Sequence, residues 1–269
     1  MAISVVINTY NAEQHLAEVL ETVKNFDEIV VCDMESTDST VKIANEYGCK
    51  VVTFPKGNYT IVEPARNFAI QSASNEWVLL VDADELVTPQ LHDFVYDAIS
   101  KPNCPDAFFV PRKNHVFGKY LKSTYPDYQF RFFRKEGVDW PPYIHSVPTI
   151  DGVVEHIPKE REDCALIHLS STARSSFIKM NDYSDNDLIK RGAKSVSILN
   201  LIFEPSFRFF KNYILKGGIF YGRLGFIQAC NNAIGRYMLV VKQMERNNEI
   251  KSGLKKNKIK SNCFDPKLH

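Results

Sequence analysis

The first 100 residues alternate between two hydrophobic periods, and this alternation limits the folds open to the chain. Short apolar runs rich in β-branched residues predict buried strands over Ile3–Ile7, Glu28–Asp33, Lys50–Phe54 and Trp77–Val81. Helical spacing between these runs predicts helices over 12–24, 39–47, 62–73 and 89–100. Because strand and helix strictly alternate, we expect right-handed crossovers and a parallel sheet. The fold class predicted is α/β.

The pattern changes after residue 105. Further short runs predict strands over Ala107–Pro111, Tyr128–Phe133, Ile144–Val147, Val153–Ile157 and Ala165–Leu169, some of them antiparallel. Helical spacing returns from residue 173 and predicts helices over 174–192, 206–216 and 223–246. We therefore expect one domain over 1–172, with a nucleotide-binding part over 1–100 and an acceptor part over 101–172. A helical extension over 173–248 and a polar, Lys-rich tail over 249–269 complete the chain.

The charge is divided unevenly along the sequence. The formal net charge is +1, but residues 1–173 carry 15 basic and 25 acidic side chains (15 − 25 = −10), and residues 174–269 carry 18 basic and 7 acidic ones (18 − 7 = +11). Aromatic residues accompany the cations in the second part, which favours contact with an anionic membrane surface through residues 205–260, with a solvated helical appendage as the alternative. Because no nucleic-acid-binding motif accompanies this charge, nucleic acid is not an expected partner.

Composition indicates a cytoplasmic protein. No apolar run reaches the roughly 18 residues that a membrane span needs, and no basic flank typical of a signal peptide precedes the first strand. The six cysteines are scattered without a C-x-x-C pair, which favours reduced thiols. We expect the protein to be cytoplasmic and peripheral on the inner face of the cytoplasmic membrane.

Polar residues follow the predicted strands at the edge where α/β sheets bind ligands. The first glycine is Gly48, so neither a G-x-G-x-x-G dinucleotide loop nor a phosphate-binding P-loop can follow the first strand. Asp82-Ala83-Asp84 instead follows the apolar strand over 77–81. Two carboxylates at a strand end suit Mg²⁺ or Mn²⁺ that is also held by substrate phosphates. The sequence therefore predicts a divalent-metal and diphosphate site here, with plain strand-ending acids as the alternative.

An ordered set of motifs now gives a family resemblance. Its segments are Ser4–Asn11, Ile29–Asp33 with Ser36–Thr40, Pro64–Asn67 and Leu79–Glu85. Together they resemble the family 2 glycosyltransferases, which implies the GT-A nucleotide-diphospho-sugar transferase fold, with a Rossmann-like, mostly parallel sheet. Later segments resemble the lipopolysaccharide core β-1,4-glucosyltransferase branch of that family, and they include Phe130–Arg134, Ile144–His145, Leu166–His168, Lys179–Ser184 and Pro205–Ile214. The resemblance spans about residues 2–246 and leaves out only the tail.

The resemblance also implies donor-site roles. Thr9 and Tyr10 would line the nucleobase and ribose pocket, and Asp33 would hold uridine. Arg66 would face the diphosphate or order Asp82.

The metal ligands and the general base are assigned in the same way. Asp84 would bind the metal, Asp82 would contact ribose or a metal-bound water, and His168 would complete the metal shell or touch phosphate, while His145 is a second candidate histidine. The family branch often has glutamate directly after the histidine, but Ser146 stands here, so the general base is left among Asp139, Asp127 and Glu85. Asp139 ranks first because the rigid Asp139–Pro142 stretch stands just before His145.

The sequence thus predicts a metal-dependent, inverting glycosyltransferase. It would move a hexose, with glucose the first expectation, from a nucleotide sugar such as a UDP-sugar. The acceptor would be a lipopolysaccharide core or another lipid-linked or phosphorylated surface glycan. Two alternatives stand beside it. One is a catalytically inactive, membrane-associated binding protein of the same fold, and the other is a sugar nucleotidyltransferase, which would need a Gly-rich basic loop after the first strand.

Overall fold

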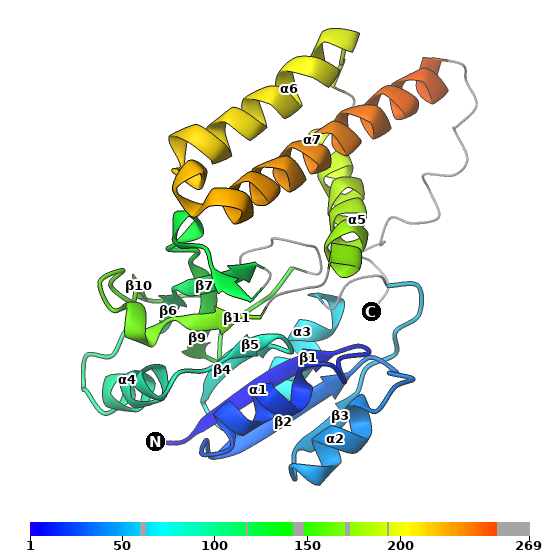
Figure 1. Ribbon diagram of the computed structural model, residues 1–269. Coiled ribbons are helices and arrows are strands. Elements are labelled where there is room, and N and C mark those ends of the chain that lie inside the picture. The colour runs from blue at the N-terminus through cyan, green and yellow to red at the C-terminus, as the bar shows by residue number, and fades with distance from the viewer. Residues whose placement is uncertain (60–62, 117, 142–147, 170–172, 193, 252–269) are drawn as a thin grey trace. The chain divides into compact units, whose positions relative to one another are not determined.

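The computed structural model describes residues 1–59, 63–116, 118–141, 148–169, 173–192 and 194–251 (Figure 1). The chain divides into two compact units, Met1–Ser171 and Thr172–His269. The first is built on a mixed sheet and the second on helices.

A seven-stranded sheet forms the centre of the first unit. In spatial order its strands are β10 (Val154–His156), β6 (Ala107–Val110), β9 (Gln129–Arg134), β4 (Trp77–Asp82), β1 (Ile3–Thr9), β2 (Glu28–Asp33) and β3 (Lys50–Thr53). The four strands from β4 to β3 are mutually parallel, as are β10 and β6, whereas β9 runs antiparallel to both of its neighbours. The α/β fold with a mostly parallel sheet is therefore confirmed.

Helices supply a core on each face of this sheet. Val5 and Ile7 of β1 pack in one apolar cluster with α1 (Leu16–Val23) and α4 (Pro89–Ile99). Val6, which points the other way, packs in a second cluster with α3 (Arg66–Gln71). A strand covered on both faces buries every residue, which explains why these strands read as unbroken apolar runs. The fourth helix of this part, α2, spans Thr40–Glu46.

The first unit also contains a smaller second sheet, of which the sequence predicted only one strand. Its order is β5 (Glu85–Leu86), β11 (Leu166–His168), β7 (Arg112–Val116) and β8 (Lys119–Tyr120). Only β11 was expected, because β5 and β8 are two residues long and β7 is almost entirely polar. The register sets His168 opposite Glu85 on one side and Asn114 on the other. The strand predicted over 144–147 lies outside the described residues.

The second unit contains α5 (Ala173–Arg191), α6 (Ile198–Phe210) and α7 (Gly222–Lys251). A π-helical turn (Lys211–Leu215) and a 3-10 turn (Gly218–Tyr221) join α6 to α7. The prediction that a helix starts at residue 206 was wrong, because Ser197 and Asn200 form a capping box that starts α6 earlier and Pro205 lies inside the helix. No helix in the described part of the chain is long and apolar enough to cross a bilayer.

Candidate functional site

The loops after β1 and β2 meet at the carboxyl edge of the sheet. Thr9 and Asp33 are partners in the parallel register, and the Thr9 hydroxyl donates to Asp33 Oδ1 at 2.9 Å. The Ser36 N–H donates to Asp33 Oδ2 at 2.8 Å, and its hydroxyl donates to Oδ1 at 2.5 Å. The structure thus brings together two of the predicted donor residues and fixes the buried Asp33 carboxylate with three donors.

Tyr10 lies on the exposed side of the same edge. Its ring is open to solvent, and Lys56 Nζ stands 4.6 Å from the ring centroid. Asn11 and Glu35, at the two neighbouring strand ends, adopt left-handed backbone conformations with φ of 48° and 59°. Such conformations are uncommon for residues other than glycine and concentrate at ligand sites. The carboxyl edge of the sheet therefore exposes the Tyr10 ring beside the Lys56 ammonium, next to two loops with left-handed backbone turns.

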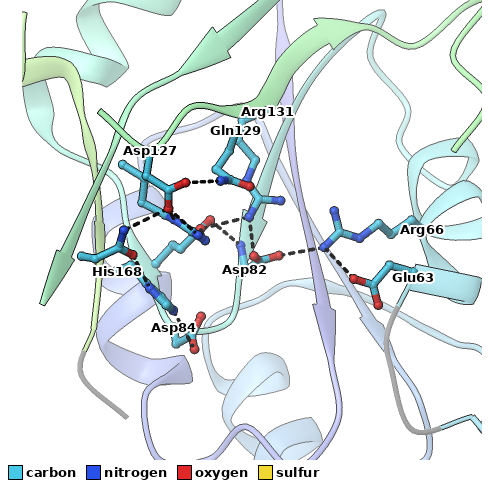
Figure 2. A network of polar contacts seen from close by, with 11 residues as sticks. Glu63, Arg66, Asp82, Asp84, Asp127, Gln129, Arg131 and His168 are labelled. Carbon is cyan, nitrogen blue, oxygen red and sulfur yellow. Dashed lines mark hydrogen bonds and ion pairs between the residues drawn. The ribbon is translucent and has the colours of Figure 1, made fainter. Parts of the chain in front are cut away.

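Asp82, at the end of β4, is bound by two arginines (Figure 2). Arg66 Nη2 donates to Asp82 Oδ1 at 3.3 Å, and Arg131 of β9 donates to Oδ2. Burial alone would raise the pKa of this carboxyl, but Arg131 and Arg66 outweigh it and lower the pKa to about 2. Asp82 is consequently ionised at neutral pH and largely neutralised by its own protein.

Glu85 lies next to Asp82 and Arg131 and is fully buried. Arg131 donates to Glu85 Oε1 at 2.9 Å and Arg112 donates to the same atom at 2.8 Å. The Asp82 backbone N–H donates to Oε2 at 3.0 Å. A buried carboxylate is stable only when it is paired and hydrogen-bonded, and these three donors meet that condition. The geometry gives Glu85 the part of a counter-ion for two arginines.

Asp127 is the third carboxylate of the network. Arg112 donates to Asp127 Oδ2 from Nε at 3.0 Å and from Nη2 at 2.7 Å. Asn114 Nδ2 donates to Oδ2 at 2.9 Å, and Gln129 donates to Oδ1 at 3.0 Å. Burial would raise the pKa of Asp127, but Arg112 and the two amides outweigh it, so the pKa lies below its usual value.

The contact between Asp84 and His168 differs from these ion pairs. His168 Nε2 lies 3.4 Å from Asp84 Oδ2, and both side chains are 27% exposed. His168 Nδ1 lies 2.8 Å from Asn114 Oδ1. Because the ionised Asp127 carboxylate can only accept, Asn114 must turn its NH₂ group to Asp127 and its oxygen to His168. Nδ1 then donates to that oxygen, and Nε2 is the ring nitrogen that faces the Asp84 carboxylate.

Asp84 Oδ2 and His168 Nε2 thus face each other as two potential metal ligands. A carboxylate and an imidazole whose other nitrogen is fixed by a hydrogen bond are a familiar metal-binding pair. Within the described residues, no cluster of three or more His, Cys, Asp or Glu side chains is placed to hold a metal ion. Mg²⁺ and Mn²⁺ commonly bind through one or two carboxylates together with substrate phosphates, so the residues present fit such an ion.

Asp139 lies on the α3 side of the sheet. Asn67 of α3 donates to Asp139 Oδ1 at 2.9 Å, and the Trp140 N–H donates to Asn67 Oδ1 at 2.8 Å. The Trp140 ring covers the Arg66 guanidinium, with 4.7 Å between ring centroid and Cζ. Asp139 is exposed and, of the three candidate bases, is the one outside the arginine network. His145 lies outside the described residues.

Several residues of this site were not singled out from the sequence: Arg112, Asn114, Gln129, Arg131 and Asn67. A signal existed for Arg131, which stands in the alternating Phe130-Arg131-Phe132-Phe133 run of a buried strand. A buried guanidinium requires a carboxylate partner, and the nearest acidic motif is that of β4. No comparable signal marks Asn114 or Asn67, because their roles depend on strand register and loop packing.

The family model described as Glycosyl transferase family 2 matches residues 4–171. This span covers more than half of the chain, and the chain belongs to glycosyltransferase family 2. The resemblance noted from the sequence motifs is therefore confirmed, and the protein is a glycosyltransferase rather than a sugar nucleotidyltransferase.

Individual relatives agree with this assignment. An uncharacterised glycosyltransferase of Rickettsia conorii is 29% identical over 265 residues, covering 90% of each chain. The lipopolysaccharide core biosynthesis glycosyltransferase LpsC of Rhizobium meliloti is 22% identical and covers 91% of this chain and 93% of its own. Among solved structures, the mannosyltransferase PcManGT of Pyrobaculum calidifontis, in complex with GDP-Man and Mn²⁺, has a TM-score of 0.54 at 14% identity, covering 90% of this chain and 87% of its own. That likeness shows the shared fold.

Removing the Glu85 charge should destabilise the protein strongly. In Glu85→Gln, Arg131 and Arg112 lose the carboxylate they share, and unpairing buried charges costs about 3–5 kcal/mol. Urea unfolding followed by circular dichroism should show this loss in the free energy of unfolding. Glu136→Gln, at an exposed position, is the matched control and should change that free energy by less than about 0.5 kcal/mol. Equal effects of the two substitutions would contradict the proposed counter-ion role.

Proposed function

We propose that this glycosyltransferase transfers a hexose, with glucose the first expectation, from a nucleotide sugar with inversion at the anomeric carbon. The reaction would require Mg²⁺ or Mn²⁺. The observation that carries the proposal is the pairing of Asp84 with His168 beside an Asp82 that is already neutralised by arginines. The complex of PcManGT with GDP-Man and Mn²⁺ supports the choice of a nucleotide-sugar donor and a divalent ion.

In this proposal Asp84 and His168 are the direct metal ligands. Asn114 keeps the Nε2 lone pair of His168 available, and Asp127 keeps Asn114 in the orientation that does so. Asp82 is engaged by Arg66 and Arg131, so it would contact the ribose or a metal-bound water. When bound, the cation would neutralise charge on the donor diphosphate and on the departing nucleoside diphosphate.

The donor would lie along the carboxyl edge of the sheet. The exposed ring of Tyr10 can stack on a nucleobase, and Thr9 and Asp33 would complete the pocket for the base and ribose. Arg66 is buried between Trp140 and Asp82, and its Nε has no acceptor among the residues that the structure describes. A guanidinium can bridge two oxygen groups, so Arg66 would contact both Asp82 and the diphosphate.

Asp139 is the candidate base that the geometry supports best. In an inverting transfer the acceptor hydroxyl oxygen bonds to the anomeric carbon while the bond from that carbon to the diphosphate oxygen breaks. The hydroxyl proton passes to a carboxylate, and the nucleoside diphosphate leaves with the bonding electrons. Asp139 is exposed and accepts a hydrogen bond from Asn67, whereas Glu85 and Asp127 are bound by arginines. Arg112 and the two amides lower the pKa of Asp127, which makes it a poor proton acceptor, and Glu85 is fully buried.

The acceptor is proposed from the relatives and from the chain's charge. LpsC of Rhizobium meliloti is described as a lipopolysaccharide core biosynthesis enzyme, and it matches over nine tenths of this chain. We therefore propose a lipopolysaccharide core or another lipid-linked or phosphorylated surface glycan as the acceptor. Such an acceptor would be met at the inner face of the cytoplasmic membrane, which places the enzyme in the cytoplasm and peripheral to that membrane.

Asp84→Ala should abolish turnover of the nucleotide sugar. The substitution removes the carboxylate of the proposed metal pair and leaves the arginine-bound Asp82 in place. The measurement is release of nucleoside diphosphate from UDP- and GDP-sugars with Mn²⁺, Mg²⁺ or a chelator. Unchanged activity of Asp84→Ala, or full activity of the native protein in chelator, would contradict the metal proposal. Donor binding without turnover by the native protein would favour the inactive-protein alternative.

Asn114→Leu should weaken binding of Mn²⁺ in the presence of UDP by about 10–100-fold. Without the amide oxygen, the imidazole of His168 is no longer held with its Nε2 lone pair toward Asp84. Titration calorimetry measures this affinity without relying on catalysis. Asn75→Leu, in the turn before β4, serves as the control. An unchanged affinity in Asn114→Leu would show that the hydrogen bond to His168 has no part in metal binding.

Asp139→Asn should lower kcat for sugar transfer by about 10²–10⁴-fold while leaving the Kd of the nucleotide sugar unchanged. The amide keeps the hydrogen-bonding shape beside Asn67 but cannot take a proton. Single-turnover transfer and donor titration separate the two quantities. A parallel loss of donor affinity, or a full rate, would argue that Asp139 is not the base.

A further inference from the structure

Helix α6 of the second unit carries its apolar side chains outward. Six of them, all between 48% and 70% exposed, are Ile198, Leu199, Ile202, Phe203, Phe207 and Phe210. At 100° per residue these positions cover about half of the helix circumference, and the polar residue within that arc is Ser206. No residue of α6 is buried. A helix of a globular domain normally turns such an arc toward the core, so this face lacks the covering that its composition requires.

The opposite side of α6 is fixed to its neighbours by charge. Glu204 accepts from Arg191 of α5 at 2.7 Å and pairs with Arg236 of α7 at 2.8 Å. Asn200 Nδ2 also donates to Glu204, at 3.1 Å. The apolar arc is therefore directed away from α5 and α7 by a specific ion-pair arrangement, and its exposure is a built feature of the helical unit.

The apolar face continues beyond α6. Ile214, Leu215, Ile219 and Phe220 are also exposed, Phe220 by 88%. Phe209, Tyr213 and Phe226 contact one another in tilted and edge-on arrangements, with ring centroids 5.3–5.6 Å apart. Part of the aromatic content of this region thus packs the turn between α6 and α7, although Phe226 itself is 49% exposed.

The charges in this region identify the partner. Three cations, Arg208, Lys211 and Lys216, are exposed within α6 and the turn that follows it, and Arg223 is exposed at the start of α7. Glu204 is the single carboxylate of residues 188–244, and it is already paired. An apolar face with surrounding cations matches the interface of an anionic bilayer, where acyl chains meet negative headgroups. A second copy of the chain would instead bring like charges together.

We propose that α6 and the turns up to Tyr221 form a membrane-insertion surface that binds anionic lipid, with the apolar arc in the headgroup–acyl boundary. The membrane-insertion surface rests on the proposed function only because a lipid-linked acceptor would be met at a bilayer. It also changes the boundary expected from the sequence, since the surface starts at Ile198 rather than at residue 205. Residues 252–260 of that expectation lie outside the described part.

Vesicle sedimentation of the full chain tests the proposal. Binding should be strong to phosphatidylcholine mixed with phosphatidylglycerol and weak to phosphatidylcholine alone. The double variant Phe203→Ser, Phe207→Ser should lower the partition coefficient at least about tenfold with an unchanged Tm, because both rings are exposed in the free protein. The triple variant Arg208→Gln, Lys211→Gln, Lys216→Gln should remove the preference for anionic vesicles, since each cation near the surface contributes roughly a fivefold factor.

Matched controls come from the first unit. Val153→Ser removes an exposed apolar side chain there, and Lys42→Gln, Lys101→Gln, Lys119→Gln together remove three exposed cations. Both should bind vesicles as the native protein does. Phe203→Trp adds a readout that needs no disruptive change, since its fluorescence should shift to the blue and be quenched by brominated lipid.

Three outcomes would overturn the proposal. The Phe203, Phe207 variant could bind as well as native protein, binding could ignore lipid charge, or ultracentrifugation could show a dimer that this variant abolishes while vesicles are not bound. Release of nucleoside diphosphate, measured without vesicles, reports separately on the proposed function. Vesicle binding with no turnover would refute only the proposed function, and turnover with no vesicle binding would refute only the membrane surface.

Discussion

The arrangement of the first unit depends on the pairing of buried arginines with the carboxylates that follow β4. Arg131 projects from β9 and contacts both Asp82 and Glu85, and Arg112 of β7 joins Glu85 to Asp127. Each of these charges would be costly to bury alone. The antiparallel strand β9 is therefore joined to β4 by charge as well as by backbone hydrogen bonds. The network pairs three arginines with three carboxylates, so the net charge of −10 carried by residues 1–173 comes from residues outside it.

The arginine pairs also distinguish three carboxylates that are held by arginines from Asp84, which contacts a histidine. Asp82, Glu85 and Asp127 are bound by arginines, whereas Asp84 faces Nε2 of His168. This difference follows from the small second sheet, where β11 lies between β5 and β7 and sets His168 opposite Asn114. A chain of polar contacts that begins at Arg112 thus ends at one imidazole nitrogen that faces a carboxylate. The metal-dependent chemistry proposed for this family member depends on that orientation.

How well each element could be predicted from the sequence depends on whether neighbouring or distant residues determine it. The alternating strands and helices up to residue 100 depend on local hydrophobic period, and they were predicted with ends mostly within a few residues. The carboxyl-edge motifs were found because strand ends can be located in the same way. The second sheet was missed, apart from β11, because β5 and β8 are too short to show a period. The start of α6 was missed because the helix was expected only from residue 206, whereas the capping box of Ser197 and Asn200 starts it at Ile198. The links from Asp127 through Asn114 to His168 are set by register between distant strands, which no single sequence displays.

The central claim is that a divalent cation binds between the Asp84 carboxylate and the lone pair of His168, beside an Asp82 that arginines have neutralised. The most direct measurement is anomalous diffraction from crystals grown with Mn²⁺ and UDP. The account predicts one strong Mn²⁺ peak within bonding distance of an Asp84 carboxylate oxygen and of His168 Nε2, with diphosphate oxygens completing the shell. A Mn²⁺ ion ligated by Asp82 with Arg66 and Arg131 displaced, or no peak at Asp84 while UDP is bound, would contradict it.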